Sequence, residues 1–146
     1  MRKPLVAVAG AAILLGLGWA LLAGPEGGRP TQQSEVACDG RDRPDPGAPA
    51  TLPLGLPMTS GATVLRVGLV GRTTVAHAVL PGTREDIVSV RDRVLEDLKA
   101  AGYTVVGTDQ EPGFEAEAEL GGTHDGTLQV SPLCDGKLKV RYKIQQ

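Results

Sequence analysis

The sequence is short of the side chains that most often carry chemistry. Its 146 residues include two cysteines, two histidines and four aromatic side chains, and asparagine is absent. Two cysteines are too few for a zinc cluster or a disulfide-dense scaffold. Two histidines leave little material for metal or acid–base chemistry. We therefore expect no cofactor and no metal site.

A large excess of either charge is also missing. Fifteen basic against 17 acidic side chains give a formal net charge of −2 at pH 7. Nucleic-acid-binding domains carry a clearly basic face, so we expect no nucleic-acid partner. Apolar residues make up 41% of the chain and charged residues 22%, which excludes collagen, coiled coil and full disorder.

Recognisable catalytic motifs are absent as well. The sequence has no Ser-His-Asp set in a known context, no metal-ligand spacing and no phosphate-binding glycine loop. His77 lies in a predicted strand beside Val75 and Val79, where we expect a structural role. His124 begins a His-Asp-Gly sequence that is typical of a turn. We predict that the protein is not an enzyme and assign no catalytic residue.

Near its N-terminus the chain has a long uncharged run. Two basic residues precede Pro4–Ala23, which carries no charge. A helix of that length spans about 30 Å, the thickness of a bilayer core, and the basic residues place its N-terminus in the cytoplasm. We predict that residues 1–24 form a signal anchor, contact the lipid bilayer through residues 4–23 and hold the rest of a single-pass protein on the extracytoplasmic side. The alternative is a signal peptide cleaved after Ala20, which would give a secreted protein.

Residues 25–61 have the composition of a linker. Proline and glycine account for 13 of these 37 residues, and only nine are apolar. Repeated proline removes backbone donors and favours extended conformations, so we expect a Pro/Gly-rich stalk without regular elements. Thr51–Met58 is more apolar than its surroundings, and we expect it to lie against the folded domain as a lead-in strand or coil.

Residues 62–146 have the patterns of one small domain. Alternation of apolar and polar residues predicts six strands. Their expected ranges are 63–70, 73–80, 103–108, 114–120, 127–133 and 137–144. The alternation in the first of these places Leu65, Val67 and Leu69 on one side. In the fourth strand, Phe114 begins the side that we expect to be buried.

One helix is predicted between the second and third strands. Its apolar face consists of Ile87, Val90, Val94, Leu98 and Ala101, at spacings of three and four. Arg91 is expected to face water. Thr83 and Asp86 resemble a capping box at the start, and Gly102 is a natural cap at the end. The helix is therefore expected to cover residues 84–101.

The order of elements, ββα-ββββ, predicts a hairpin, one helix and a four-strand meander. One amphipathic helix covers one face of a sheet, so we expect an α+β fold, a two-layer sandwich whose other sheet face is in water. Asp135-Gly136 signals the last hairpin turn, but a plain two-residue turn would pair Val130 with Arg141 and mix the faces. We expect either a three-residue loop, which pairs Val130 with Tyr142, or a bulge near Pro132.

Cys38 and Cys134 are the candidate disulfide. In an exported chain they have an oxidising environment and no other cysteine partner in the sequence. Closing a loop of about 100 residues stabilises a fold by about 4.7 kcal/mol in the chain-entropy model. We expect an intramolecular bridge that holds residues 38–61 along the domain. An intermolecular bridge and free thiols are the alternatives.

The water-facing side chains of two strands form the candidate interaction face. One strand presents an acidic ladder and the other a basic ladder: Glu115, Glu117, Glu119; Lys137, Lys139, Arg141, Lys143. If the meander runs in order, a neutral strand separates the two ladders by about 10 Å. The basic ladder has a second possible place, at the sheet edge, where lysines discourage aggregation. The face is either a solvated surface or a docking site for an anionic polymer, a lipid headgroup or a protein.

Three functions remain open. The favoured one is a membrane-tethered extracytoplasmic binding module whose partner is an envelope protein or an anionic polymer. A structural or accessory subunit of a cell-envelope complex is the first alternative. It would use a stripe of small residues in the anchor, Ala12, Gly16 and Ala20, as its interface. A hydrolase-like enzyme is the second alternative.

Overall fold

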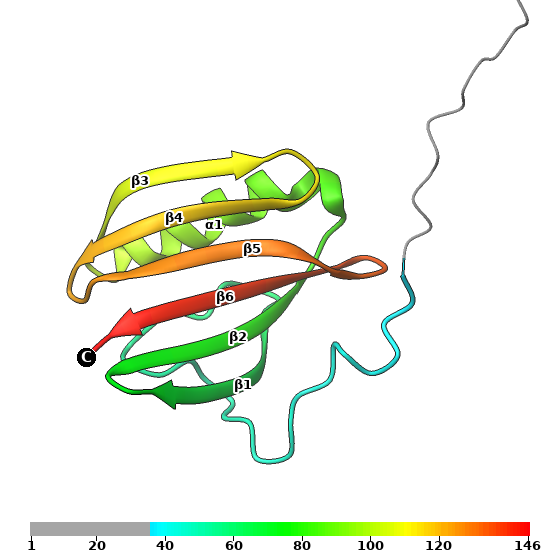
Figure 1. Ribbon diagram of the computed structural model, residues 1–146, viewed down its shortest axis with the longest axis horizontal. Helices are drawn as coiled ribbons and strands as arrows, with labels where there is room; N and C mark the ends of the chain where they lie inside the picture. The colour runs from blue at the N-terminus through cyan, green and yellow to red at the C-terminus, as the bar shows by residue number, and fades with distance from the viewer. Residues whose placement is uncertain (1–35) are drawn as a thin grey trace, which may run out of the picture. The chain divides into compact units, whose positions relative to one another are not determined.

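A computed structural model of the protein describes residues 36–146 (Figure 1). The predicted anchor, residues 1–24, lies outside the described residues. The elements are β1 (Thr63–Val70), β2 (Thr73–Pro81), α1 (Ile87–Ala100), β3 (Tyr103–Glu111), β4 (Glu115–Gly122), β5 (Gly126–Cys134) and β6 (Lys137–Gln145). The six strands form one antiparallel sheet in the order β1-β2-β6-β5-β4-β3. The predicted α+β architecture of one antiparallel sheet and one helix is confirmed.

The last strand, β6, occupies the middle of the sheet. It pairs with β2 from Thr73↔Gln145 to Pro81↔Lys137 and with β5 on its other side. Its alternate side chains Leu138, Val140, Tyr142 and Ile144 are all 1% exposed or less. The basic ladder therefore runs through the middle of the sheet, and the suggestion that it guards an edge is wrong.

The turn between β5 and β6 corrects the expected register. Asp135 and Gly136 form a two-residue turn, with Cys134 opposite Lys137. A register shift between Pro132 and Cys134 then places Val130 opposite Val140, both on the buried face. The expectation of a bulge near Pro132 is confirmed, whereas the three-residue loop is wrong. The extra residue in β5 restores the match of apolar faces that a plain two-residue turn would lose.

The start of the helix forms as expected, but one side chain that was predicted to face water is buried. The backbone N–H and the hydroxyl of Thr83 both donate to the Asp86 carboxylate, at 2.8 and 2.9 Å. A 3₁₀ turn at residues 84–86 leads into α1. Arg91, expected in water, is 7% exposed, and it donates both to Asp92 and to the Asp109 carbonyl of β3. The edge strand thus gives this guanidinium a polar partner, which allows its stem to be buried.

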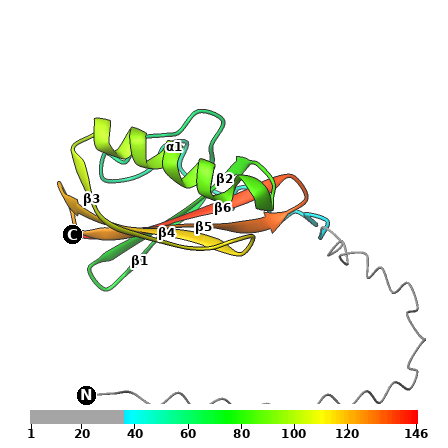
Figure 2. The ribbon, with the colours of Figure 1, turned by 90° about the horizontal axis from the view of Figure 1, so that it is seen from above.

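A single helix does not cover a six-stranded sheet, and the rest of that layer comes from residues before β1. Helix α1 packs against β3, β4 and β5. Leu52 and Leu56, from the compositional linker, are 6% and 4% exposed and belong to the same core cluster. The hydroxyl of Thr59 donates to Asp97 of α1 at 2.6 Å. Figure 2 shows this segment and α1 on the same side of the sheet.

Three side chains expected in the core are exposed. Ala101, the last residue of the predicted apolar helix face, lies just beyond the end of α1 at Ala100 and is exposed. Leu69 is 64% exposed, because it lies near the hairpin end of the edge strand β1. A register shift between Val64 and Arg66 also interrupts the expected alternation in this strand. Phe114 is 56% exposed, because it lies in the turn that precedes β4.

Within residues 36–146, no helix has both the length and the apolar character that crossing a membrane requires.

Candidate functional site

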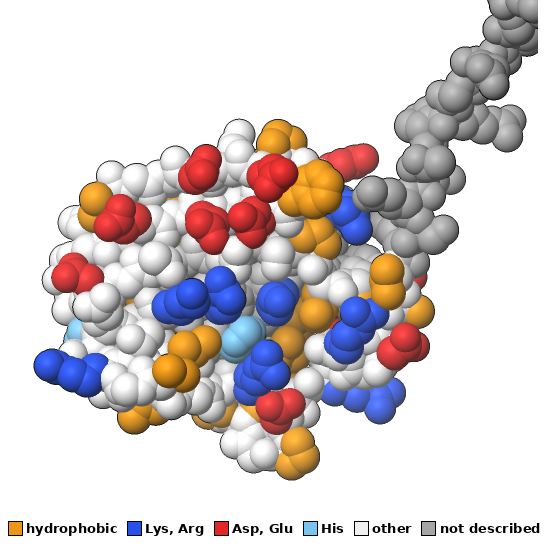
Figure 3. All heavy atoms as spheres, in the orientation of Figure 1, with side chains coloured by type: hydrophobic (Ala, Val, Ile, Leu, Met, Phe, Trp, Pro, Cys, Tyr) orange, Lys and Arg blue, Asp and Glu red, His pale blue; other side chains and the backbone are white. Residues whose placement is uncertain are grey.

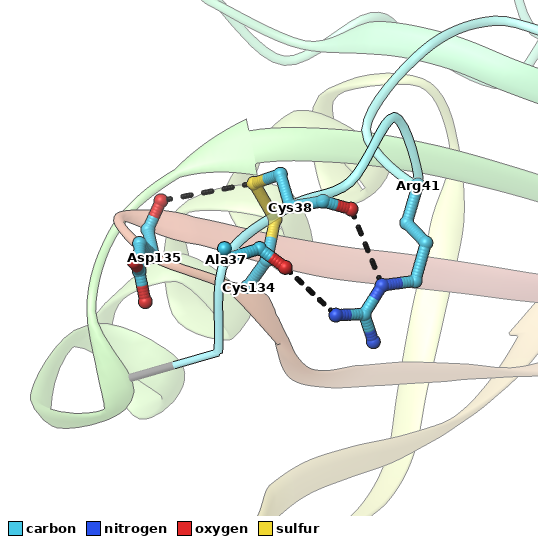
Figure 4. Close-up of a disulfide and its surroundings, with 5 residues drawn as sticks. All are labelled: Ala37, Cys38, Arg41, Cys134 and Asp135. Atoms are coloured by element: carbon cyan, nitrogen blue, oxygen red, sulfur yellow. Dashed lines mark hydrogen bonds between the residues drawn. A yellow bond between two sulfur atoms is a disulfide. The ribbon is translucent and has the colours of Figure 1, made fainter. Parts of the chain in front are cut away.

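The predicted disulfide joins the segment before β1 to the end of β5. Cys38 and Cys134 are bonded, across a sequence separation of 96 residues (Figure 4). Beside the bond, the N–H of Asp135 donates to the Val36 carbonyl at 3.0 Å. The Arg41 guanidinium donates to the carbonyls of Ala37 and Cys38, at 2.8 and 3.2 Å. These contacts fix the start of the described segment against the β5–β6 turn.

From the disulfide, residues 38–61 pass around the edge of the sheet. The N–H of Asp45 donates to the Leu65 carbonyl of β1 at 2.8 Å, which ties the segment to the edge strand. Residues between the disulfide and this hydrogen bond line a hollow on the open face of the sheet, which is the face that α1 does not cover. Leu52 and Leu56, which follow Asp45 in the segment, lie in the core on the opposite face of the sheet. One segment therefore contributes to both faces.

The open face carries its charges in two separate groups. Cross-strand pairing places one residue from each strand in a single row: Arg66, His77, Arg141, Gln129, Glu117 and Asp109, from β1 to β3. Basic residues lie on the β1 and β6 side of the row, and acidic residues lie on β4 and β3. Figure 3 shows the same separation, with Asp and Glu gathered over β3 and β4 and Lys and Arg over β6 and the strands beyond it.

The neutral strand β5 separates the predicted ladders. Its outward side chains are Thr127, Gln129 and Ser131, and its neighbours are β4 and β6. The amide of Gln129 donates to both Glu115 and Glu117, at 2.5 and 2.8 Å, so it binds the acidic side only. Within the described part of the chain, no ion pair joins the two ladders. Both charged groups thus remain open to solvent and to a partner.

A hollow of about 330 Å³ lies at the basic end of this face. Four cations and one carboxylate are among its lining residues: Arg41, Arg43, Arg66, Lys139 and Asp45. His77 also lines it, from β2. The structure therefore places three arginines beside Lys139 of the predicted basic ladder. Two of these come from the compositional linker, and no periodicity in the sequence points to them.

The surroundings of His77 disfavour its protonated form. Burial, followed by the charges of Arg66, Lys139 and Arg141, lowers the pKa of His77 from 6.5 to about 4, and Asp45 opposes this effect. A general base works best with a pKa near the operating pH. This imidazole is neutral at pH 7 and a weak base, which gives little support to the hydrolase alternative. His124 lies in the turn between β4 and β5 and is not among the residues of the hollow.

The lowered pKa of His77 predicts a pH-dependent stability. Between about pH 6.5 and pH 4, the unfolded chain binds a proton at His77 that the folded chain does not. The contribution of His77 is therefore complete above pH 6.5 and is lost as the pH falls towards 4. Replacing His77→Gln should flatten the slope of unfolding free energy against pH in this window, measured by urea denaturation. The matched variant His124→Gln removes the imidazole outside the hollow, and an equal flattening by both variants would contradict the assignment.

The structure brings the predicted acidic and basic ladders onto one face and adds the basic hollow beside them. Comparison with known proteins gives no further guide: a scan of protein-family models found no match, and a search of curated proteins found none.

Proposed function

We propose that the protein is a membrane-tethered extracytoplasmic binding module whose open sheet face docks a charged partner. The tether would be the uncharged run at residues 4–23, with the N-terminus in the cytoplasm. Support for an extracytoplasmic domain comes from the Cys38–Cys134 bond, because disulfides persist mainly in oxidising compartments. In the secreted alternative, cleavage would remove the tether and leave the same binding face.

The observation that carries the proposal is the separation of charge on the open face. A surface that serves solubility alone needs both signs interspersed, and large fields of one sign serve mainly to steer partners. Here the acidic residues lie on β3 and β4, the basic ones on β1 and β6, and uncharged side chains of β5 lie between them. A partner with opposite charges in the matching order would be both attracted and oriented.

Crosslinking in intact cells tests the proposal. A photoreactive residue at Thr127 would sit on the boundary between the two charged groups, and one at Glu96 on the exposed side of α1 serves as the matched control. We expect a discrete adduct from position 127 and none from position 96, in the full chain. Equal adducts from both positions, or none from Thr127, would contradict the proposal. An adduct formed only from residues 4–23 would instead favour an accessory subunit of a membrane complex.

A further inference from the structure

The basic hollow gathers positive charge from three parts of the chain. Arg41 and Arg43 come from the disulfide-linked segment, Arg66 from β1 and Lys139 from β6. In the described part of the protein, the side chains of Arg43, Arg66 and Lys139 make no hydrogen bond or ion pair. Asp45 is the one carboxylate among the lining residues. The hollow therefore holds an excess of positive charge.

Two buried nitrogen atoms, one on His77 in the lining of the hollow and one on its neighbour Arg141, also lack partners. Nδ1 of His77 and Nε of Arg141 are buried without a hydrogen-bond partner among the described residues. These two residues are direct cross-strand neighbours. Buried polar atoms in folded proteins are almost always hydrogen-bonded, so unpaired ones require an explanation. Burial and the charges of Arg141 and Arg66 also lower the pKa of Lys139. An anion in the hollow would relieve this repulsion and would give the imidazole of His77, which lines the hollow, a partner.

We infer that this hollow binds a phosphate group. A phosphate is tetrahedral and presents acceptor oxygens in several directions, which matches donors that arrive from the segment, β1 and β6. A carboxylate has two coplanar oxygens and would engage fewer of them. Arginine binds such oxyanions through paired N–H groups. The volume of about 330 Å³ lies at the low end of small-molecule sites and leaves room for the group that carries the phosphate.

The inference deepens the proposed function and rests on it, because it names the chemical group that the basic side of the open face would bind. It also gives the disulfide a role in binding. The Cys38–Cys134 bond and the Arg41 contacts beside it hold one wall of the hollow in place. The phosphate could belong to a soluble ester or to a lipid headgroup, and the experiment below distinguishes these two sources.

Inorganic phosphate is the first probe, added at constant ionic strength to the isotope-labelled full chain in phosphatidylcholine nanodiscs. We expect saturable NMR shift changes confined to residues of the hollow. A bound anion favours the imidazolium, so the pKa of His77 should rise from about 4. The groups that face this imidazole and set its pKa in the free protein are Arg66, Lys139, Arg141 and Asp45.

A pair of matched double variants tests the assignment. Arg66→Gln with Lys139→Gln should weaken phosphate binding about tenfold or more, which corresponds to about 1.4 kcal/mol. Arg93→Gln with Lys99→Gln removes the same charge from the exposed side of α1 and should change the affinity less than about twofold. Equal weakening by the two pairs would overturn the inference in favour of diffuse charge attraction. Acetate that binds as tightly as phosphate would overturn the choice of ligand.

Nanodiscs that contain phosphatidylglycerol distinguish the two sources. A rise in the pKa of His77 without added phosphate, lost in the Arg66→Gln/Lys139→Gln variant, would identify a lipid headgroup. An unchanged His77 in these nanodiscs, together with a response to free phosphate, would identify a soluble ester. The inference fails separately from the proposed function: without any phosphate response, an adduct from Thr127 would still support a binding face of different ligand chemistry.

Discussion

Replacing both cysteines with serine should lower the free energy of unfolding by as much as about 4.7 kcal/mol, the chain-entropy value for a loop of about 100 residues. The bond closes a loop across a sequence separation of 96 residues, which includes α1 and five of the six strands, with β6 outside it. Without it, the unfolded chain gains freedom that the folded chain does not. A small domain with only three aromatic side chains has little core to offset this loss.

Urea denaturation of the full chain in a mild detergent measures the effect. Wild-type protein treated with a reductant should unfold at the same midpoint as the double variant Cys38→Ser/Cys134→Ser, because both lack the same bond. The reduced protein should also bind phosphate more weakly, since the wall that carries Arg41 and Arg43 is released. If the reduced protein and the double variant unfolded at the same urea midpoint as the oxidised wild type, the bond would contribute nothing to stability.

Replacing Leu128→Ala should cost about 2–5 kcal/mol, the range for a buried leucine whose removal leaves a cavity. Leu128 is 0% exposed and lies between Ala118 of β4 and Tyr142 of β6. Strand β5 is covered by α1, so solvent does not fill the space. The side chain of the neighbouring Ala118 is too short to fill the cavity.

The matched control is the same substitution at an exposed leucine. Leu69 is 64% exposed near the end of β1, and Leu69→Ala should change the unfolding free energy by less than about 0.5 kcal/mol. Both variants are compared by the same urea denaturation. Similar costs for the two substitutions would contradict the assignment of the core to the β5 and α1 layers.

Local patterns predict the elements because each depends on neighbouring residues. Strict alternation in the β4 and β6 segments, and the Thr83/Asp86 cap of the helix, require no knowledge of the rest of the fold. The pairing of β2 with β6 is different, because it joins residues 56 to 72 positions apart and carries no local signal. The same holds for Arg91, whose burial depends on a backbone carbonyl supplied by β3.

Composition predicts a linker at residues 25–61, and the apolar Thr51–Met58 stretch predicts contact with the domain, but neither predicts that the segment reaches both faces of the sheet. Leu52 and Leu56 fill the part of the core that α1 leaves uncovered. Arg43 lies at the hollow on the opposite face of the sheet. Proline-rich sequence rules out regular elements, and the segment packs through isolated side chains between its turns. The basic hollow follows from that path and from the disulfide, so the basic ladder was predictable and the hollow was not.

The side of the membrane on which Gln146 lies tests the proposed function most directly. Fusion of Gln146 to a phosphatase that is active only after export, and separately to a fluorescent protein that folds only in the cytosol, measures it in living cells. A tether at residues 4–23 with its N-terminus in the cytoplasm predicts phosphatase activity and no fluorescence. Fluorescence without phosphatase activity would place the domain in the cytosol and contradict the proposed extracytoplasmic function.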